Sequence, residues 1–133
     1  MEPVAVVESF VARINAQDVD GLCALMTEDH CFVDSMGGEL DGLDVLRQAW
    51  TKYFAMVPDY EVVLEEVFQD GSHIGAFGIA RGTYAPKGEL RAENRWSTPA
   101  AWRAEVRGKK VALWRVYGDN EPIRRLIATA AAS

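Results

Sequence analysis

The hydrophobic spacing of this chain changes near residue 59, and the change limits the folds open to it. Before that point apolar residues recur at intervals of three and four, the spacing of helices with one buried face. After it, from Tyr60 to Val67, alternate residues share a face, which is the period of strands. Helices followed by strands predict an α+β fold, with the helices gathered on one face of an antiparallel sheet.

Two helices and a short strand are expected first. Pro3 suits the first position of a helix. Its apolar stripe would be Val4, Val7, Phe10, Val11 and Ile14. Asp18 suits the N-cap of a short second helix that carries Leu22, Leu25 and Met26 on one side. A brief strand would then run from His30 to Asp34 into a glycine-containing loop.

A third helix should begin near Asp41 or Gly42 and end before Pro58. Asp70-Gly71 is a hairpin signal, so the segments on either side of it should pair. The further strands are expected at about 73–84, 92–106 and 111–117. Residues 121–132 would close the chain as a helix or a tail. We expect a single domain over residues 1–133.

Composition and charge exclude several classes of protein. Apolar residues make up 49% of the chain and charged residues 26%, which is ordinary for a globular domain. The formal charge of −6 argues against nucleic acid or an anionic membrane as a partner. Glu2 and Glu8 flank the first apolar run, unlike a signal peptide, and Cys23 and Cys31 form no disulfide framework. We therefore expect a cytoplasmic protein.

Motifs for metals, nucleotides and covalent nucleophiles are not found in the sequence. There is no glycine-rich dinucleotide loop, Walker loop or nucleophile elbow. His30 and His73 are the two imidazoles, too few for a multi-ligand zinc site. Gly75, Gly78 and Gly82 lie within one expected strand, where they would permit the sheet to curve. We expect neither a metal nor a cofactor.

Several local strings resemble the nuclear transport factor 2-like superfamily, which includes the SnoaL-like cyclases and ketosteroid isomerase. The strings are FVARINAQDVDGL (10–22), TEDHCFVD (27–34), the helix after Gly42 as far as Tyr53-Phe54, and WRVYGDN (114–120). The resemblance implies a cone-shaped, cystatin-like roll, in which a curved sheet wraps a long helix and leaves an apolar pocket open at one end. It also implies a homodimer formed through the outer face of the sheet. The fold does not fix the reaction, because its members include enzymes and binding scaffolds.

The resemblance reaches chemistry at Asp34. Through the string Phe32-Val33-Asp34, this residue matches the carboxylate that removes a proton beside a ketone in isomerase-like members. The two oxyanion-hole donors of the isomerase are missing, because Phe10 stands at the tyrosine position and Ala101 or Trp102 at the acid position. Losing one such donor costs about 3 kcal/mol of transition-state stabilisation. A steroid isomerase is therefore not expected.

The candidate catalytic residues are Asp34 as base, His30 as acid or orienting group, and Tyr53 as hydrogen-bond donor. His30 and Asp34 cannot form a pair, since four residues of strand span about 13 Å. Each also has a structural explanation: Asp34 as a turn cap, His30 as a core histidine, and Tyr53 as an edge residue with its hydroxyl in water. The expected pocket walls are Phe32, Trp50, Phe54, Trp96, Trp102 and Trp114, although most aromatic residues would simply form the core.

The sequence predicts cofactor-independent acid/base chemistry on a hydrophobic carbonyl compound, such as cyclisation, isomerisation or dehydration. The alternative is a non-catalytic ligand-binding or dimerisation module that uses the same pocket. A desolvated Asp34 with a second polar group nearby would favour the enzyme, whereas an Asp34 bonded to turn amides would favour the module. An epoxide hydrolase set of Asp34, Arg115 and Asp119 has weak support, because Arg115 could face outward and Asp119 could cap a helix.

Overall fold

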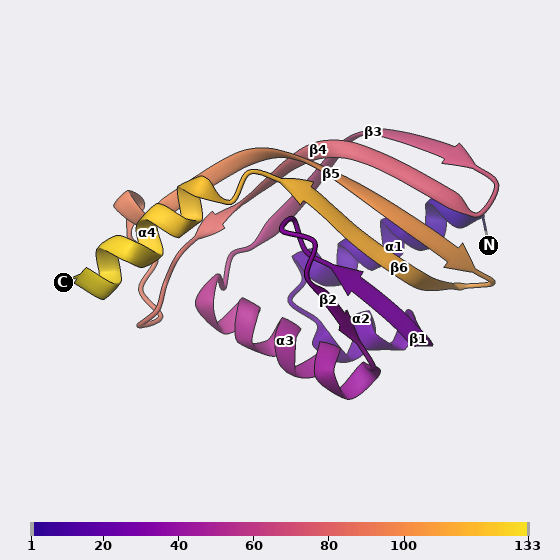
Figure 1. Cartoon of the computed structure of the whole chain (residues 1–133), viewed down its shortest axis with the longest axis horizontal. Coiled ribbons are helices and arrows are strands. Elements are labelled where there is room, and N and C mark those ends of the chain that lie inside the picture. The colour runs from indigo at the N-terminus through magenta and orange to yellow at the C-terminus, as the bar shows by residue number, and fades with distance from the viewer. Residues whose placement is uncertain (1, 133) are drawn as a thin grey trace.

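A curved sheet arches over α1, and α2 and α3 lie on the same side of it (Figure 1). The computed structural model describes residues 2–132, and the strand order among them is β2-β1-β6-β5-β4-β3. The helices are α1 (Pro3–Asn15), α2 (Val19–Ala24), α3 (Leu43–Met56) and α4 (Glu121–Ala132), with a 3-10 turn at Ala92–Asn94. The strands are β1 (Met26–Val33), β2 (Glu39–Asp41), β3 (Glu61–Asp70), β4 (His73–Thr83), β5 (Arg95–Arg107) and β6 (Lys110–Gly118). This is the α+β, cystatin-like arrangement that the sequence predicted.

The helix boundaries follow the expected signals. Pro3 opens α1, and the Asp18 Oδ1 atom accepts a hydrogen bond of 2.9 Å from the Gly21 amide at the start of α2. Gly42, with a φ of 96°, stands at the N-cap of α3, a backbone conformation that favours glycine. The buried face of α3 consists of Leu46, Trp50 and Phe54. Residues 121–132 form a helix rather than a tail, at the opposite end of the molecule from the N-terminus (Figure 1).

The N-terminal strands differ from the prediction. Met26 begins β1 instead of ending the second helix, because this segment pairs in parallel with β6, with Phe32 beside Trp114. The sequence also did not predict β2, which pairs antiparallel with the outer edge of β1. All three of its residues are exposed, so they carry no alternating apolar pattern to signal a strand. The remaining strand pairs are antiparallel.

The two faces of the sheet are now assigned. Trp114 and Val116 of β6 face the helices, whereas Tyr117 is exposed on the outer face. On β5, Trp96 and Trp102 are buried on the inner face. The structure therefore settles which side of the last strand faces inward, a question that alternation alone left open.

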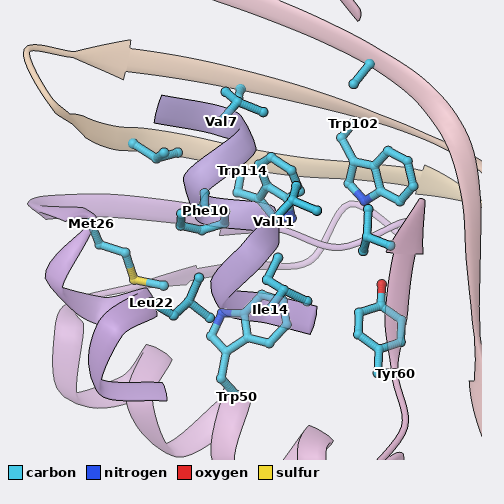
Figure 2. Packing of buried hydrophobic residues seen from close by; sticks show 14 of the residues in the cluster. Val7, Phe10, Val11, Ile14, Leu22, Met26, Trp50, Tyr60, Trp102 and Trp114 are labelled. Atoms are coloured by element: carbon cyan, nitrogen blue, oxygen red, sulfur yellow. The ribbon is translucent and has the colours of Figure 1, made fainter. Parts of the chain in front are cut away.

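The core is built around the first helix and the inner face of the sheet. Phe10 is fully buried, and its ring lies 4.9 Å from that of Trp114, which stacks in turn on Trp102 at 6.3 Å (Figure 2). Cys23 and Cys31 are free thiols. None of the helices in residues 2–132 is long and apolar enough to cross a membrane.

Gly78 of β4 lies opposite the place where β3 bulges, between Leu64 and Glu66. A Cβ at this glycine would lie 1.8 Å from the Val63 carbonyl oxygen, a contact that the backbone could relieve only by moving. Gly75, on the same strand, has nothing within 4 Å of the equivalent position. Gly78 therefore permits the close approach of β3 to β4, as glycines in strands often do.

We predict that Gly78→Ala lowers the free energy of unfolding by about 3 kcal/mol, because the added methyl group overlaps backbone atoms. Gly75→Ala is the matched control and should stay within about 1 kcal/mol of the parent protein. Urea denaturation followed by tryptophan fluorescence measures both. Equal stability of the two variants would show that the bulge does not depend on Gly78.

Candidate functional site

A cavity of about 270 Å³ lies between the inner face of the sheet and α3. Its aromatic lining comes from β1, α3, the start of β3, β5 and β6. The lining residues are Phe32, Asp34, Ser35, Leu46, Ala49, Trp50, Tyr53, Tyr60, Ala80, Trp96, Thr98, Ala100, Trp114, Val116, Gly118 and Asn120. Most of this surface is apolar, so the cavity suits a hydrophobic small molecule.

Three polar residues of the lining, Asp34, Ser35 and Asn120, lie just beyond the ends of β1 and β6. Asp34 is exposed, and its Oδ1 atom accepts hydrogen bonds from the amides of Met36 and Gly38, at 2.8 and 2.9 Å. The Asn120 side-chain amide donates a hydrogen bond to the Ser35 hydroxyl and ties the two chain segments together. Asp34 thus combines a position at the cavity with a turn-capping role.

Two tyrosines place phenol groups in the apolar part of the cavity. Tyr60 is 8% exposed and Tyr53 is half-buried, and their rings meet at 90° with centroids 5.0 Å apart. Burial raises the pKa of both hydroxyls well above the ordinary value of tyrosine, so they remain protonated donors. Sequence reasoning selected Tyr53 but missed Tyr60, which precedes β3 and shares its inward face with Val62.

His30 lies in the core, away from the cavity lining among the residues described. It is fully buried, and its ring is 5.9 Å from that of Phe10. Its Nδ1 atom lies 2.6 Å from the Val111 carbonyl oxygen, which can only accept, so Nδ1 carries the proton. The separation along the strand excluded a direct hydrogen bond between His30 and Asp34 but allowed both to line one pocket. In the structure Asp34 lines the cavity and His30 does not.

A family comparison agrees with this geometry. Residues 7–114 match the family model described as the SnoaL-like domain. The chain belongs to the SnoaL-like family. Comparison with curated protein sequences gives no match.

Solved structures share the fold of this SnoaL-like domain at low sequence identity. A proposed SnoaL-like polyketide cyclase from Shewanella putrefaciens CN-32 is 14% identical, with 97% of this chain and 98% of that chain covered and a TM-score of 0.81. An LEH-like epoxide hydrolase from M. tuberculosis is 18% identical, with 98% and 96% covered and a TM-score of 0.77.

A third solved structure was determined with a bound small molecule. It is a hypothetical protein with a ketosteroid isomerase-like fold from Catenulispora acidiphila DSM 44928, in complex with trimethylamine. It is 19% identical, with 84% of this chain and 83% of that chain covered and a TM-score of 0.73. At these identities the comparisons show the shared fold and leave the reaction open.

Four of the six expected wall residues line the cavity of the SnoaL-like domain. They are Phe32, Trp50, Trp96 and Trp114. Phe54 and Trp102 are instead core residues, because Phe54 packs beside Trp50 and Trp102 stacks under Trp114. The sequence selected all six as walls, but it could give neither the inward side of the last strand nor the depth of each residue along the sheet.

The epoxide hydrolase set does not assemble in this SnoaL-like domain. The Arg115 guanidinium lies 4.9 Å from the ring of Tyr117, which is exposed on the outer face of the sheet. The Asp119 Oδ1 atom accepts from the Glu121 amide at 2.9 Å, a cap at the start of α4. The described residues also include no cluster of three or more His, Cys, Asp or Glu that could hold a metal ion.

The buried imidazole makes a testable contribution to stability. Burial lowers the pKa of His30 below its ordinary value, and this outweighs the Val111 hydrogen bond and the carboxylates of Asp29 and Asp41, which favour the charged ring. The unfolded chain then binds a proton before the folded chain does. The stability from neutral His30 is fully present above the unfolded pKa of about 6.5 and is lost as the pH falls below it.

We predict that the free energy of unfolding, measured with urea, decreases from pH 8 to pH 5.5 in the parent protein. His30→Leu should reduce this decrease, whatever its effect on stability at pH 8. His73→Asn, which replaces an exposed histidine, is the control and should behave like the parent. An unchanged pH dependence in His30→Leu would contradict the assignment.

Proposed function

We propose that the cavity binds a hydrophobic carbonyl compound and that Asp34 and Tyr53 carry out cofactor-independent acid/base chemistry on it. The observation that supports this is the composition of a single cavity. Its walls are aromatic, it contains two protonated phenols, and a carboxylate stands at the end where β1 stops. Cyclisation, isomerisation and dehydration all begin with proton transfer at or beside a carbonyl, which these groups can perform.

Asp34 is the proposed base. The two turn amides bind Oδ1 and fix the direction of the carboxylate, while Oδ2 accepts no hydrogen bond from the residues described. A carboxylate oxygen held in one orientation beside an apolar cavity can take a proton from a bound ligand. Positioning of this kind removes part of the entropic cost of the proton transfer.

Tyr53 is the proposed donor to the carbonyl oxygen, with Tyr60 beside it. Removing a proton next to a ketone creates negative charge on that oxygen, and donors aimed at it stabilise the transition state. Burial keeps both hydroxyls protonated, so each can donate. The tyrosine pair would supply the oxyanion stabilisation that neither Phe10 nor the residue at the acid position, Ala101 or Trp102, can provide.

His30 has no part in this proposal, because its proton is committed to the Val111 carbonyl in the core. A second candidate function, non-catalytic ligand binding, is favoured by the criterion given in the sequence analysis. Asp34 is exposed and one of its oxygens is bonded to turn amides, as a purely structural cap would be. The related structure with trimethylamine is consistent with either function, since it records binding alone.

We predict that the protein accelerates hydrogen–deuterium exchange at the carbon next to the carbonyl of 2-tetralone in D₂O, measured by proton NMR. Asp34→Asn should slow this exchange about 100-fold, because asparagine keeps the turn bonds but is not a base. Tyr53→Phe should slow it by about the same factor through loss of a donor. Asp41→Asn changes an exposed carboxylate outside the cavity lining and is the control.

Thermal shift with the same ketone separates the two candidate functions. Binding without accelerated exchange in the parent protein would favour the non-catalytic module. Equal exchange rates in the parent and Asp34→Asn would remove Asp34 as the base. Absence of both binding and exchange would overturn the ketone proposal.

We also propose that two copies of the chain pair through the outer face of the sheet. Three large side chains on that face are substantially exposed: Phe68 by 57%, Phe77 by 50% and Tyr117 by 45%. Phe68 and Phe77 contact each other edge to face, with ring centroids 6.0 Å apart. Grouped exposed aromatic residues commonly mark a protein–protein interface.

We predict a dimer in sedimentation equilibrium, and a monomer after Phe77→Asp, because a buried unpaired carboxylate would oppose association. Leu90→Asp is the matched control, since Leu90 is equally exposed (59%) but lies in the loop between β4 and β5. A monomeric parent protein, or a dimer that survives Phe77→Asp, would contradict this interface.

A further inference from the structure

Four rings of the cavity form a chain of contacts, in which each ring is nearly perpendicular to the next. Phe32 and Trp50 meet at 76° with centroids 5.8 Å apart, Trp50 and Tyr53 at 86° and 6.5 Å, and Tyr53 and Tyr60 at 90° and 5.0 Å. Trp96 lies beside Tyr60, with centroids 6.1 Å apart and the ring planes inclined at 35°. Edge-to-face contacts are a preferred packing of aromatic rings in general. What distinguishes these five rings is that all of them line one cavity, and we call them the aromatic box.

An aromatic box of this kind has a preferred ligand. The face of each ring carries partial negative charge, so it attracts a cation within about 6 Å of its centroid. The attraction is stronger where water is excluded, and Trp50, Tyr60 and Trp96 are each at least nine-tenths buried. Figure 2 shows the rings of Trp50 and Tyr60 directed into the interior, Trp50 from α3 and Tyr60 from the segment just before β3.

The charges around the cavity have one sign. Among the described residues that line it, Asp34 is the charged side chain, and none is lysine, arginine or histidine. The chain as a whole carries a formal charge of −6. Both the local carboxylate and the long-range field therefore attract cations and repel anions. Asp34 contributes by its charge alone, so its free oxygen remains available as a base.

We propose that this cavity recognises organic ammonium ions with apolar substituents, and binds them in preference to neutral molecules of the same shape. The inference rests on the proposed ligand-binding function of the cavity and names the chemical class of that ligand: a hydrophobic compound with a tertiary or quaternary amine, held in the aromatic box. Any carbonyl group that reacts belongs to the same molecule, near Tyr53 and Asp34.

Phenyltrimethylammonium and tert-butylbenzene are the test pair, because they have the same shape and differ in the charge of one central atom. By titration of tryptophan fluorescence, we expect the ammonium ion to bind about tenfold more tightly than the hydrocarbon. Asp34→Asn should weaken binding of the ammonium ion about fivefold and leave the hydrocarbon unaffected. Asp41→Asn, the control for net charge, should have an effect of about twofold at most, since solvent and salt screen it.

A second pair of variants tests the ring face directly. Trp50→Phe and Trp50→Leu both shorten the side chain, but phenylalanine keeps an aromatic face and leucine does not. The preference for the ammonium ion should survive in the first variant and fall by about half in the second, because the carboxylate of Asp34 remains in both. Circular dichroism spectra establish that both variants are folded.

Three outcomes would overturn the proposal. Equal affinity for the two probes in the parent protein would show a neutral apolar cavity and leave the proposed ligand binding intact. An ammonium preference unchanged in both Asp34→Asn and Trp50→Leu would place the binding elsewhere. Binding of neither probe would overturn this inference, and if 2-tetralone also fails to bind, the proposed function fails with it.

Discussion

The parallel pairing of β1 with β6 is the contact on which the rest of the site depends. It joins the helical first part of the chain to the meander that follows, and it sets Phe32 beside Trp114 on the inner face. Both strands run in the same direction and end at the same end of the sheet. Ser35 and Asn120 therefore meet there, and Asp34 lies with them. Without this pairing Ser35 and Asn120 would not be brought together at the polar end of the cavity, because more than half of the chain separates them.

The sequence predicted those parts of the fold that depend on local chemistry. Pro3, the Asp18 cap and the Asp70-Gly71 turn each act within a few residues, and the helices and hairpin appear where they indicated. The start of β1 depends on β6, which lies far along the chain, and β2 depends on the strand that β1 then forms. Glu39–Asp41 has no buried residue, and Met26 fits a helix face as well as a strand, so spacing alone could not assign them.

The same distinction applies to the candidate site. Alternation puts Trp96 and Trp102 on one face of β5, but Trp96 lines the cavity whereas Trp102 packs on Trp114 in the core. Depth along a curved sheet is a property of its tertiary bend, which alternation does not encode. Tyr60 was missed for a related reason, because it lies just before the first residue of β3 and gains its role from contact with Tyr53 and Trp96.

The phenol groups of this cavity lie on different elements from the tyrosine of the isomerase, and this difference has a physical consequence. Phe10 fills the position where a phenol would serve an isomerase, and its ring packs against His30 and Trp114 to close the core. The phenols lie instead on α3 and just before β3. Donors placed there must meet a ligand in a different orientation from one held by α1. The same cone can therefore serve a different ligand without any change in its strand order, because the orientation of the ligand depends on which wall carries the hydroxyl groups.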